Sequence, residues 1–347
     1  AAGSGAGVYA FDSEVSISNS IIRGNRGGNG AAGLRFQGTS MGTITDSEIS
    51  GNTTTDSGGA LSFRGGATGF IENTLIADNH ADGGIGGVKV RDNGTHVELF
   101  NVQLLRNTAN GGVSAIRFAN SSSGVIDQSV VAENDAPSGG AVRVRDSATL
   151  MLRQSTITGN VTQSDSGGGL LQSESSTMTV LNTIVHGNLA SNPATLQDAQ
   201  LQGTGLTLDY SLVEDWDGSF AGTGSVGGDP LFADAPNSDY RIGAGSAAID
   251  AGDTNVLVDS SDLDGSPRVL DDTGTVDTGI GGPPTIDIGA YEFQGMTPVC
   301  VGDIADDFGF AGADGQVSFG DFLFALSVLG PCGGGTPGCD FDIADDF

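Results

Sequence analysis

Basic side chains recur at two fixed positions of a motif that repeats through the first half of the chain. Seven of the 13 Lys and Arg residues lie at these positions, although the protein carries a formal net charge of −30. They are Arg35, Arg64, Lys89, Arg91, Arg117, Arg143 and Arg145, which we call the basic stripe. Closely spaced cations repel one another, and an anionic partner relieves this repulsion better than water does. The stripe therefore favours contact with an acidic polymer or an acidic protein surface.

Two carboxylates beside the stripe are the candidates for acid–base chemistry. Asp92 and Asp146 end Val-Arg-Asp segments that are two repeats apart. If the repeats stack like strands, the two side chains lie roughly 10 Å apart, close to the separation of the carboxylates in inverting glycosidases. Alternatively, each Asp pairs with a neighbouring Arg. Catalytic sites usually concentrate titratable groups and aromatic platforms, but the single Trp, Trp216, lies outside the stripe. We therefore nominate no catalytic residue and keep these aspartates as an alternative.

An Asn residue sets the period of the repeat. It occurs at Asn25, Asn52, Asn79, Asn107, Asn134, Asn160 and Asn188. The spacing is 26 to 28 residues, with aliphatic residues eight and three positions before each Asn and a mainly amide column six positions before it. A Gly-rich turn after the Asn leads into a second short segment, in which apolar and polar residues alternate as in a β-strand.

These segments are too short and too rich in Gly for helical repeats. They predict an all-β fold, a right-handed parallel β-helix whose coils of about 27 residues stack roughly 4.8 Å apart. Aliphatic columns would fill the bore, and the stripe would lie on the outer face of one column of strands. We expect the repeated Asn to take a left-handed backbone at a turn and to bond its amide to those of adjacent coils.

The repeat resembles the pectate-lyase-like β-helix superfamily over residues 1–220. Enzymes of that superfamily bind uronates along such a face and use Arg or Lys as base with Ca²⁺-binding acids. The resemblance implies Arg117, with Asp92 and Asp146, as an alternative catalytic set in a secreted lyase or glycoside hydrolase acting on acidic polysaccharide. Such coils also form adhesins and spacers, so the fold alone assigns no activity. The first coil starts partway through, and we expect preceding residues or another subunit to cover its open edge.

Charge is distributed unevenly along the chain. Residues 1–190 carry 11 basic and 16 acidic side chains, whereas residues 191–347 carry 2 basic and 27 acidic ones. This surplus of acid excludes general binding to nucleic acid or to an anionic membrane surface. No apolar run approaches the ~20 residues that a membrane-spanning helix needs.

Residues 221–295 lose the period and are the predicted terminal coils and cap. The run from Asp229 to Phe293 resembles the C-terminal part of secreted bacterial β-helix proteins with a "choice-of-anchor" ending, which implies an exported or surface protein. Asp262, Asp264 and Asp287 could bind Ca²⁺ there, or they could be turn-forming aspartates that accept hydrogen bonds from the local backbone. We favour the second role.

Residues 296–347 contain a Cys- and Asp-rich module and the start of a second copy. Seven of the nine residues at 300–308 recur at 339–347, and we expect the second copy to be truncated. The run from Asp314 to Asp321 resembles the later half of the calcium loop in dockerin modules, which dock secreted proteins onto partners. The resemblance implies Ca²⁺ as cofactor, with Asp303, Asp314, Gln316 and Asp321 as ligands. It departs from the family by an insertion after Asp303 and by a closing Asp in place of Glu.

All three cysteines lie in this module and suit an oxidising compartment. Cys300 and Cys332 frame one copy and are the predicted disulfide, which leaves Cys339 to pair beyond residue 347 or with another chain. The spacing is not that of a zinc site, and the three His residues fall in separate coils.

Three roles remain open for the basic stripe: a groove for acidic polysaccharide, a surface that receives the acidic C-terminal half of another copy, and a solvated ladder without a partner. We favour a secreted structural or adhesive protein of the cell surface. It would self-associate, end to end as a filament or as a surface layer, or dock onto another surface protein through its C-terminal module. Complementary charge would set the register of such an assembly.

Overall fold

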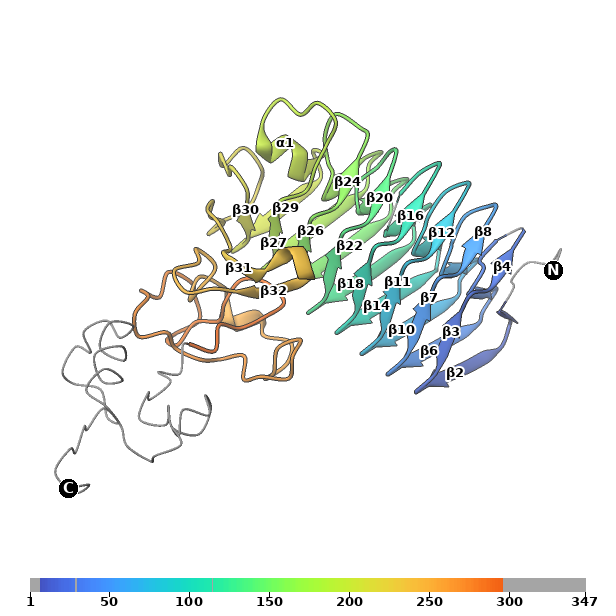
Figure 1. Cartoon of the computed structure of the whole chain (residues 1–347), viewed down its shortest axis with the longest axis horizontal. Helices are drawn as coiled ribbons and strands as arrows, with labels where there is room; N and C mark the ends of the chain where they lie inside the picture. The colour runs from blue at the N-terminus through green and yellow to red at the C-terminus, as the bar shows by residue number, and fades with distance from the viewer. Residues whose placement is uncertain (1–6, 29, 114, 296–347) are drawn as a thin grey trace, which may run out of the picture. The chain divides into compact units, whose positions relative to one another are not determined.

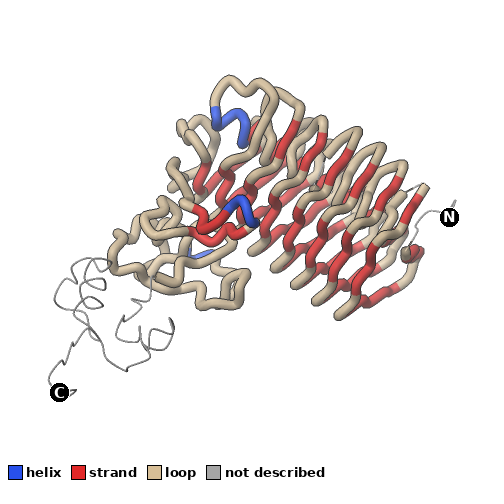
Figure 2. Tube along the Cα trace, in the orientation of Figure 1, coloured by secondary structure: helices blue, strands red, loops and turns tan. Residues whose placement is uncertain are grey.

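The computed structural model describes residues 7–28, 30–113 and 115–295, which form an all-β parallel solenoid, a right-handed β-helix (Figure 1). Each coil contributes up to four short strands, and each strand pairs in parallel with its counterpart in the next coil. Figure 2 shows the strands at the same places of successive coils. The described residues up to Gln294 belong to one compact unit. Within this described part, no helix is long and apolar enough to span a membrane.

Four parallel sheets run along the solenoid. The first sheet comprises β1 (Val8–Phe11), β5 (Leu34–Gln37), β9 (Leu61–Arg64), β13 (Val88–Arg91), β17 (Ile116–Ala119), β21 (Val142–Val144), β25 (Leu170–Gln172) and β28 (Leu201–Gln202). The second comprises β2 (Glu14–Ser18), β6 (Met41–Thr45), β10 (Thr68–Glu72), β14 (His96–Phe100), β18 (Ser123–Asp127), β22 (Thr149–Arg153), β26 (Thr177–Leu181) and β29 (Leu206–Asp209). The third comprises β3 (Ile21–Arg23), β7 (Glu48–Ser50), β11 (Leu75–Ala77), β15 (Gln103–Leu105), β19 (Val130–Ala132), β23 (Thr156–Thr158), β27 (Ile184–His186) and β30 (Leu212–Val213). The fourth comprises β4 (Arg26–Gly27), β8 (Thr53–Thr54), β12 (His80–Ala81), β16 (Thr108–Ala109), β20 (Asp135–Ala136) and β24 (Val161–Thr162).

The bore of the solenoid is filled by the predicted aliphatic columns. The residues eight and three positions before each Asn project inward from the second and third sheets, and Ile44 and Ile49 are completely buried. From the first sheet, the buried rings of Phe36 and Phe63 stack with their centroids 4.7 Å apart. Burial of side chains of this size stabilises the fold by roughly 1.5–3 kcal/mol each.

Large and small side chains compensate for one another across the bore. Gly69 in β10 faces the ring of Phe63 in β9, and a Cβ at Gly69 would lie 2.6 Å from the nearest ring carbon. In the next coil the paired positions are Val90 and Val97. The pair of Phe63 and Gly69 in one coil is thus replaced by two valines in the next. The filled volume stays similar, as the close packing of protein interiors requires.

The repeated Asn side chains form a buried ladder along the solenoid. The Oδ1 of each Asn accepts hydrogen bonds from the backbone N–H and the Nδ2 of the Asn in the preceding coil. For Asn134, the distances from the two nitrogens of Asn107 are 2.8 and 3.0 Å. The last acceptor is Gln200 in the short helix α1 (Leu196–Gln200), whose Oε1 receives both bonds from Asn188. The predicted amide bonding between coils is therefore present.

The expected left-handed backbone at the repeated Asn is wrong. Positive φ angles occur instead at the residue before each Asn, such as Gly51 with φ 61°, and in the amide column six positions before it, such as Asn73 with φ 46°. The ladder Asn must turn its side chain into the coil to reach the next amide. The turn between the second and third sheets takes the left-handed conformation, which Asn and Asp adopt more readily than other residues that carry a Cβ.

Residues 216–228 cover the C-terminal end of the coils. The backbone N–H groups of Leu208 and Val213 donate to the carbonyls of Ala221 and Val226, at 2.8 and 3.0 Å. The side chains of Trp216 and Phe220 pack against the buried residues of the bore.

Residues 229–294, which we call the flank segment, do not form further coils, in contrast to our expectation. They contain β31 (Phe232–Asp234), η1 (Ala235–Asn237), β32 (Asp239–Ile242) and η2 (Thr254–Val256) and lie along the outer face of the third sheet (Figure 1). Tyr240 and Tyr291 pack there in one buried cluster with Leu105 and Val130. The reason is that the outward side chains of β11, β15 and β19 are largely apolar, so this face needs a cover.

Hydrogen bonds from the amide column hold the flank segment in place. The backbone N–H of Val258 donates to Gln154 Oε1 at 3.1 Å, and that of Asp253 donates to Asn182 Oδ1 at 2.8 Å. Tyr240 Oη donates to Glu133 Oε1 at 2.6 Å.

Candidate functional site

The basic stripe lies on the outer face of the first sheet, where the repeat places it. Parallel pairing aligns an inner row of Arg35, Ser62, Lys89, Arg117 and Arg143. An outer row beside it contains Arg64 and Arg91, and Arg145 continues that row just after β21. Because adjacent strands are roughly 4.8 Å apart, the cations of each row are close neighbours.

The inner row is half-buried under the Gly-rich loops that lead into the first sheet. Lys89 Nζ donates to Ser57 Oγ in one of these loops. Burial lowers the pKa of Lys89 to about 8, because the opposing charge of Asp56 is outweighed by burial together with the charges of Arg117 and Arg91. Burial, reinforced by the charges of Arg145, Arg143 and Arg91, likewise lowers the pKa of Arg117 to about 10. Both cations are therefore less favourable in the folded protein than in water.

Two cations of the inner row, Arg117 and Arg143, form no ion pair within the described part of the chain. The Nε atom of each is buried there without a hydrogen-bond partner. An unpaired buried cationic group is costly, and an anion placed above the row would reduce that cost.

The outer row, in contrast, is neutralised by the two candidate carboxylates. Asp92 pairs with Arg91 at 2.9 Å and with Arg64 at 3.6 Å. Asp146 pairs with Arg145 at 2.8 Å, and Arg145 also contacts Glu174 of the following coil at 3.2 Å. The local pairing of each Asp with a neighbouring Arg, which we set against a catalytic role, is the arrangement that the structure has.

Asn120 joins these pairs into one network. When its amide is oriented to satisfy both neighbours, its nitrogen donates to Asp146 Oδ2 at 3.0 Å and its oxygen accepts from Arg91 Nη2 at 3.2 Å. Asn120 lies in the coil between Asp92 and Asp146, so it fills the place where a glycosidase of the inverting type would hold its substrate bond and water.

The protonation of the two aspartates also argues against hydrolysis. Burial alone would raise the pKa of Asp92, but the hydrogen bond and charge of Arg91 and the charge of Arg64 outweigh it and hold the pKa below its usual range. Hydrogen bonds with Glu174 and Arg145 lower the pKa of Asp146. A general acid for glycoside cleavage needs a raised pKa, which neither Asp92 nor Asp146 has.

Of the aspartates predicted as turn formers in the flank segment, Asp262 has that role, whereas Asp287 accepts hydrogen bonds from more distant backbone groups. Asp262 Oδ1 accepts from the backbone N–H groups of Asp264 and Ser266, both at 2.9 Å. Asp287 accepts from the N–H groups of Asp250 and Phe293, at 2.7 and 2.6 Å. Both carboxylates thus accept hydrogen bonds from the protein's own backbone.

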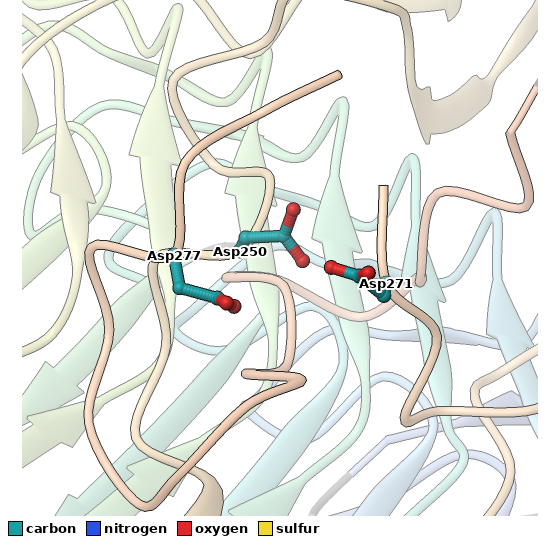
Figure 3. A group of neighbouring side chains, drawn as sticks. All are labelled: Asp250, Asp271 and Asp277. Atoms are coloured by element: carbon teal, nitrogen blue, oxygen red, sulfur yellow. The ribbon is translucent and has the colours of Figure 1, made fainter. Parts of the chain in front are cut away.

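A second group of carboxylates was not anticipated from the sequence. Asp250, Asp271 and Asp277 each offer an oxygen, and these oxygens lie within 4.8 Å of one another (Figure 3). The only signal in the sequence is that Asp250 lies in a run of small and apolar residues, Ser246 to Gly252, that is typical of a buried segment.

Two open depressions occur on the described surface, and stripe residues line neither. One, of about 590 Å³, is lined by residues 172–176 and 202–205. The other, of about 610 Å³, lies between Glu133, His186 and Tyr240. The predicted calcium ligands Asp303, Asp314, Gln316 and Asp321 and the predicted disulfide of Cys300 and Cys332 lie outside the described residues.

Comparison with known proteins agrees with the fold. The family model described as "Right handed beta helix region" matches residues 2–185. No curated protein is significantly similar to the chain. Because the family model covers more than half of the sequence, the protein belongs to the right-handed β-helix family.

Proposed function

We propose that this protein is a secreted structural or adhesive element that associates with copies of itself, or docks onto another surface protein, through its acidic C-terminal part. The observation that carries the proposal is the state of the inner row. Arg117 and Arg143 are half-buried and lack acidic partners among the described residues, while the nearby carboxylates are committed to the outer row. An external anion is what this face lacks.

The chain itself supplies a suitable anion. Residues 191–347 carry 27 acidic and 2 basic side chains, and the module at 296–347 holds many of the acids. A module from a second copy would bring acidic side chains to these cations. Such charge complementarity guides the encounter of the two copies and sets their alignment more than it strengthens their binding. Calcium bound by Asp314, Gln316 and Asp321 would order the module for docking.

The rigidity expected of a structural element is consistent with the interior. The Asn ladder and the stacked bore residues connect each coil to the next without interruption from β1 to β28. A solenoid of this kind is a quasi-one-dimensional rod, stabilised by contacts between neighbouring coils.

Sedimentation velocity of the full chain tests the proposal. With Ca²⁺ and about 0.1 M salt, we expect larger species whose share grows with protein concentration. They should dissociate at about 0.5 M salt, because screening weakens contacts between exposed charges. Arg117→Gln with Arg143→Gln should remove the larger species, whereas Arg23→Gln with Arg26→Gln, which removes the same charge from exposed positions outside the stripe, should retain them. Monomers alone under every condition would contradict the proposal.

A second candidate, a lyase acting on uronate polymers, is favoured by one observation. Lys89 has a pKa of about 8 and is surrounded by Arg side chains. A neutral Lys could remove the proton next to a uronate carboxylate, which the arginines would bind, and the glycosidic oxygen would leave as the double bond forms. This is the weaker candidate, because Lys89 donates a hydrogen bond to Ser57 and because Asp92 and Asp146 are paired with arginines of the outer row.

A further inference from the structure

The three carboxylates of Asp250, Asp271 and Asp277 form a site that ordinary turn chemistry does not explain. Asp250 comes from the buried run that precedes η2, and the other two come from the loop at 268–281. Figure 3 shows the carboxylates of Asp250 and Asp271 pointing toward each other, with that of Asp277 turned toward the same space. One oxygen of each lies within 4.8 Å of the others.

Asp250 is completely buried, and neither of its carboxylate oxygens has a hydrogen-bond partner. Its backbone, in contrast, is firmly held. The N–H donates to Asp287 Oδ1 at 2.7 Å, and the carbonyl accepts from Thr278 N at 2.9 Å and from Thr285 Oγ1 at 2.7 Å. The fold therefore fixes the position of this carboxylate without providing hydrogen-bond donors for its oxygens.

The electrostatic surroundings also make the charged form of the Asp250 carboxylate less favourable. Burial, followed by the charges of Asp277, Asp271 and Asp272, raises the pKa of Asp250 to about 6. The backbone N–H of Asp272 points toward Asp250 and opposes this rise, although it does not meet the geometry of a hydrogen bond. A buried carboxylate of this kind normally has a cationic or hydrogen-bonding partner.

Neighbouring aspartates show what a turn-forming role looks like. Asp272 accepts from Gly274 N at 3.3 Å and from Thr275 Oγ1 at 2.8 Å. Asp277 uses Oδ1 to hold Thr285, at 3.0 Å from its N and 2.9 Å from its Oγ1. The Thr285 bonds orient Asp277 toward Asp250, whereas the exposed Asp271 leaves room for water at the same point.

We propose that Asp250, Asp271 and Asp277 bind a Ca²⁺ ion that fastens the loop at 268–281 to the buried run at 246–252 within the flank segment. Carboxylate oxygens are the ligands of hard cations, and Ca²⁺–oxygen distances of about 2.3–2.6 Å allow two ligands on opposite sides of the ion to be roughly 5 Å apart. Mg²⁺ demands near-ideal octahedral geometry at about 2.0–2.1 Å and gives up its water reluctantly, so aspartates from two separate segments suit the more flexible coordination of Ca²⁺ better. Water reaching the exposed Asp271 and Asp277 would complete the six to eight ligands of Ca²⁺.

This site is separate from the calcium loop proposed in the C-terminal module, and it has a structural consequence of its own. Asp253, three residues after Asp250, exchanges two hydrogen bonds with Asn182 of the coils. Calcium at Asp250 would therefore stabilise the flank segment against the third sheet, whether or not the protein assembles.

Thermal unfolding of the full chain, with Ca²⁺, with Mg²⁺ and with a chelator, tests the proposal. At a Ca²⁺ concentration about 100-fold above Kd, the folding equilibrium shifts by the same factor, and Tm should rise by about 5 °C. Mg²⁺ should give a smaller rise. Asp250→Asn and Asp271→Asn should each abolish the rise; Asp271 is exposed, so its replacement does not disturb the fold. Asp165→Asn, the same charge change at an exposed site in the coils, should leave the rise intact.

A variant of the module separates this proposal from the proposed function. Asp314→Asn with Asp321→Asn should keep the Ca²⁺-dependent rise in Tm even if it prevents assembly. Calcium titration of this module variant by calorimetry should show one binding event, which is lost when Asp250→Asn or Asp271→Asn is added. The proposal is overturned if wild-type protein shows no rise in Tm, or if the rise persists in either of these variants.

Discussion

Replacing Asn134 by Ala is expected to destabilise the fold by about 4 kcal/mol. Asn134 is fully buried, and its Nδ2 donates to the carbonyls of Leu104 and Ala132 and to Asn160 Oδ1, at 2.9, 2.9 and 2.8 Å. Its Oδ1 accepts two further bonds from Asn107. Each buried polar group left without a partner costs about 1–3 kcal/mol, and at least two such groups remain in the variant.

The same substitution should also weaken the coupling between coils. Because stability in a solenoid is carried by contacts between neighbouring repeats, a break at Asn134 should let the two halves unfold at different urea concentrations. Urea unfolding followed by circular dichroism measures both effects. Asn192→Ala, an exposed Asn in the loop before α1, is the matched control and should change stability by less than about 0.5 kcal/mol. Equal stabilities of the two variants would refute the ladder's role.

Gly69→Val is expected to cost about 3 kcal/mol alone and to be rescued by Phe63→Val. A Cβ at Gly69 would lie 2.6 and 2.7 Å from two carbons of the Phe63 ring, so the larger side chain overpacks the bore. Phe63→Val alone removes a buried ring that stacks on Phe36 and leaves a cavity, which costs about 2–4 kcal/mol. The double variant reproduces the pair Val90 and Val97 of the next coil and should return to within about 1 kcal/mol of the original.

A double-mutant cycle measures this coupling. The free energy of unfolding of the two single variants and the double variant should be strongly non-additive, with the double variant more stable than either single one. Gly94→Val, at a position outside the bore, would not be rescued by Phe63→Val and serves as the control. Additive losses would mean that the residues do not compensate for one another across the bore.

The repetitive part of the fold could be predicted from the sequence because each coil repeats the same physical requirements. An inward aliphatic residue and a buried amide recur every 26 to 28 residues, so seven copies reinforce one interpretation. The register that aligns Lys89 with Arg117 follows from that period. The backbone conformation of the repeated Asn could not be predicted from the period. Asn is favoured both where an amide is buried and where the backbone is left-handed, so its occurrence does not distinguish the two.

The flank segment was predicted less well because it does not repeat. Its path depends on which outer face needs cover, and that information lies in residues such as Leu75 and Val130, far away in the sequence. Along the third sheet, the outward residues change from Glu48 and Ser50 to apolar residues. A comparison of these positions in the sequence would have indicated a covered face. The cluster at Asp250 depends on the same path, so no spacing in the sequence could reveal it.

For the stripe, spacing predicted which residues align but not how their charges are balanced. The pairing of Arg145 with Glu174 as well as Asp146, and the bridging position of Asn120, depend on side-chain conformations within one row of turns. Those contacts separate the neutralised outer row from Arg117 and Arg143, which form no ion pair within the described residues, and the proposed function depends on that difference.

Whether the stripe performs chemistry can be measured directly by incubating the full chain with a uronate polymer and Ca²⁺ from about pH 6 to about pH 10 and following unsaturated products. A lyase with Lys89 as base would become faster as the pH rises through about 8, because only the neutral amine accepts a proton. We predict no product above that of Lys89→Met, Arg117→Gln and Asp146→Asn at any pH in this range. Product formation by the unaltered protein that is lost in these variants would show that the stripe is an active site and would contradict the structural role.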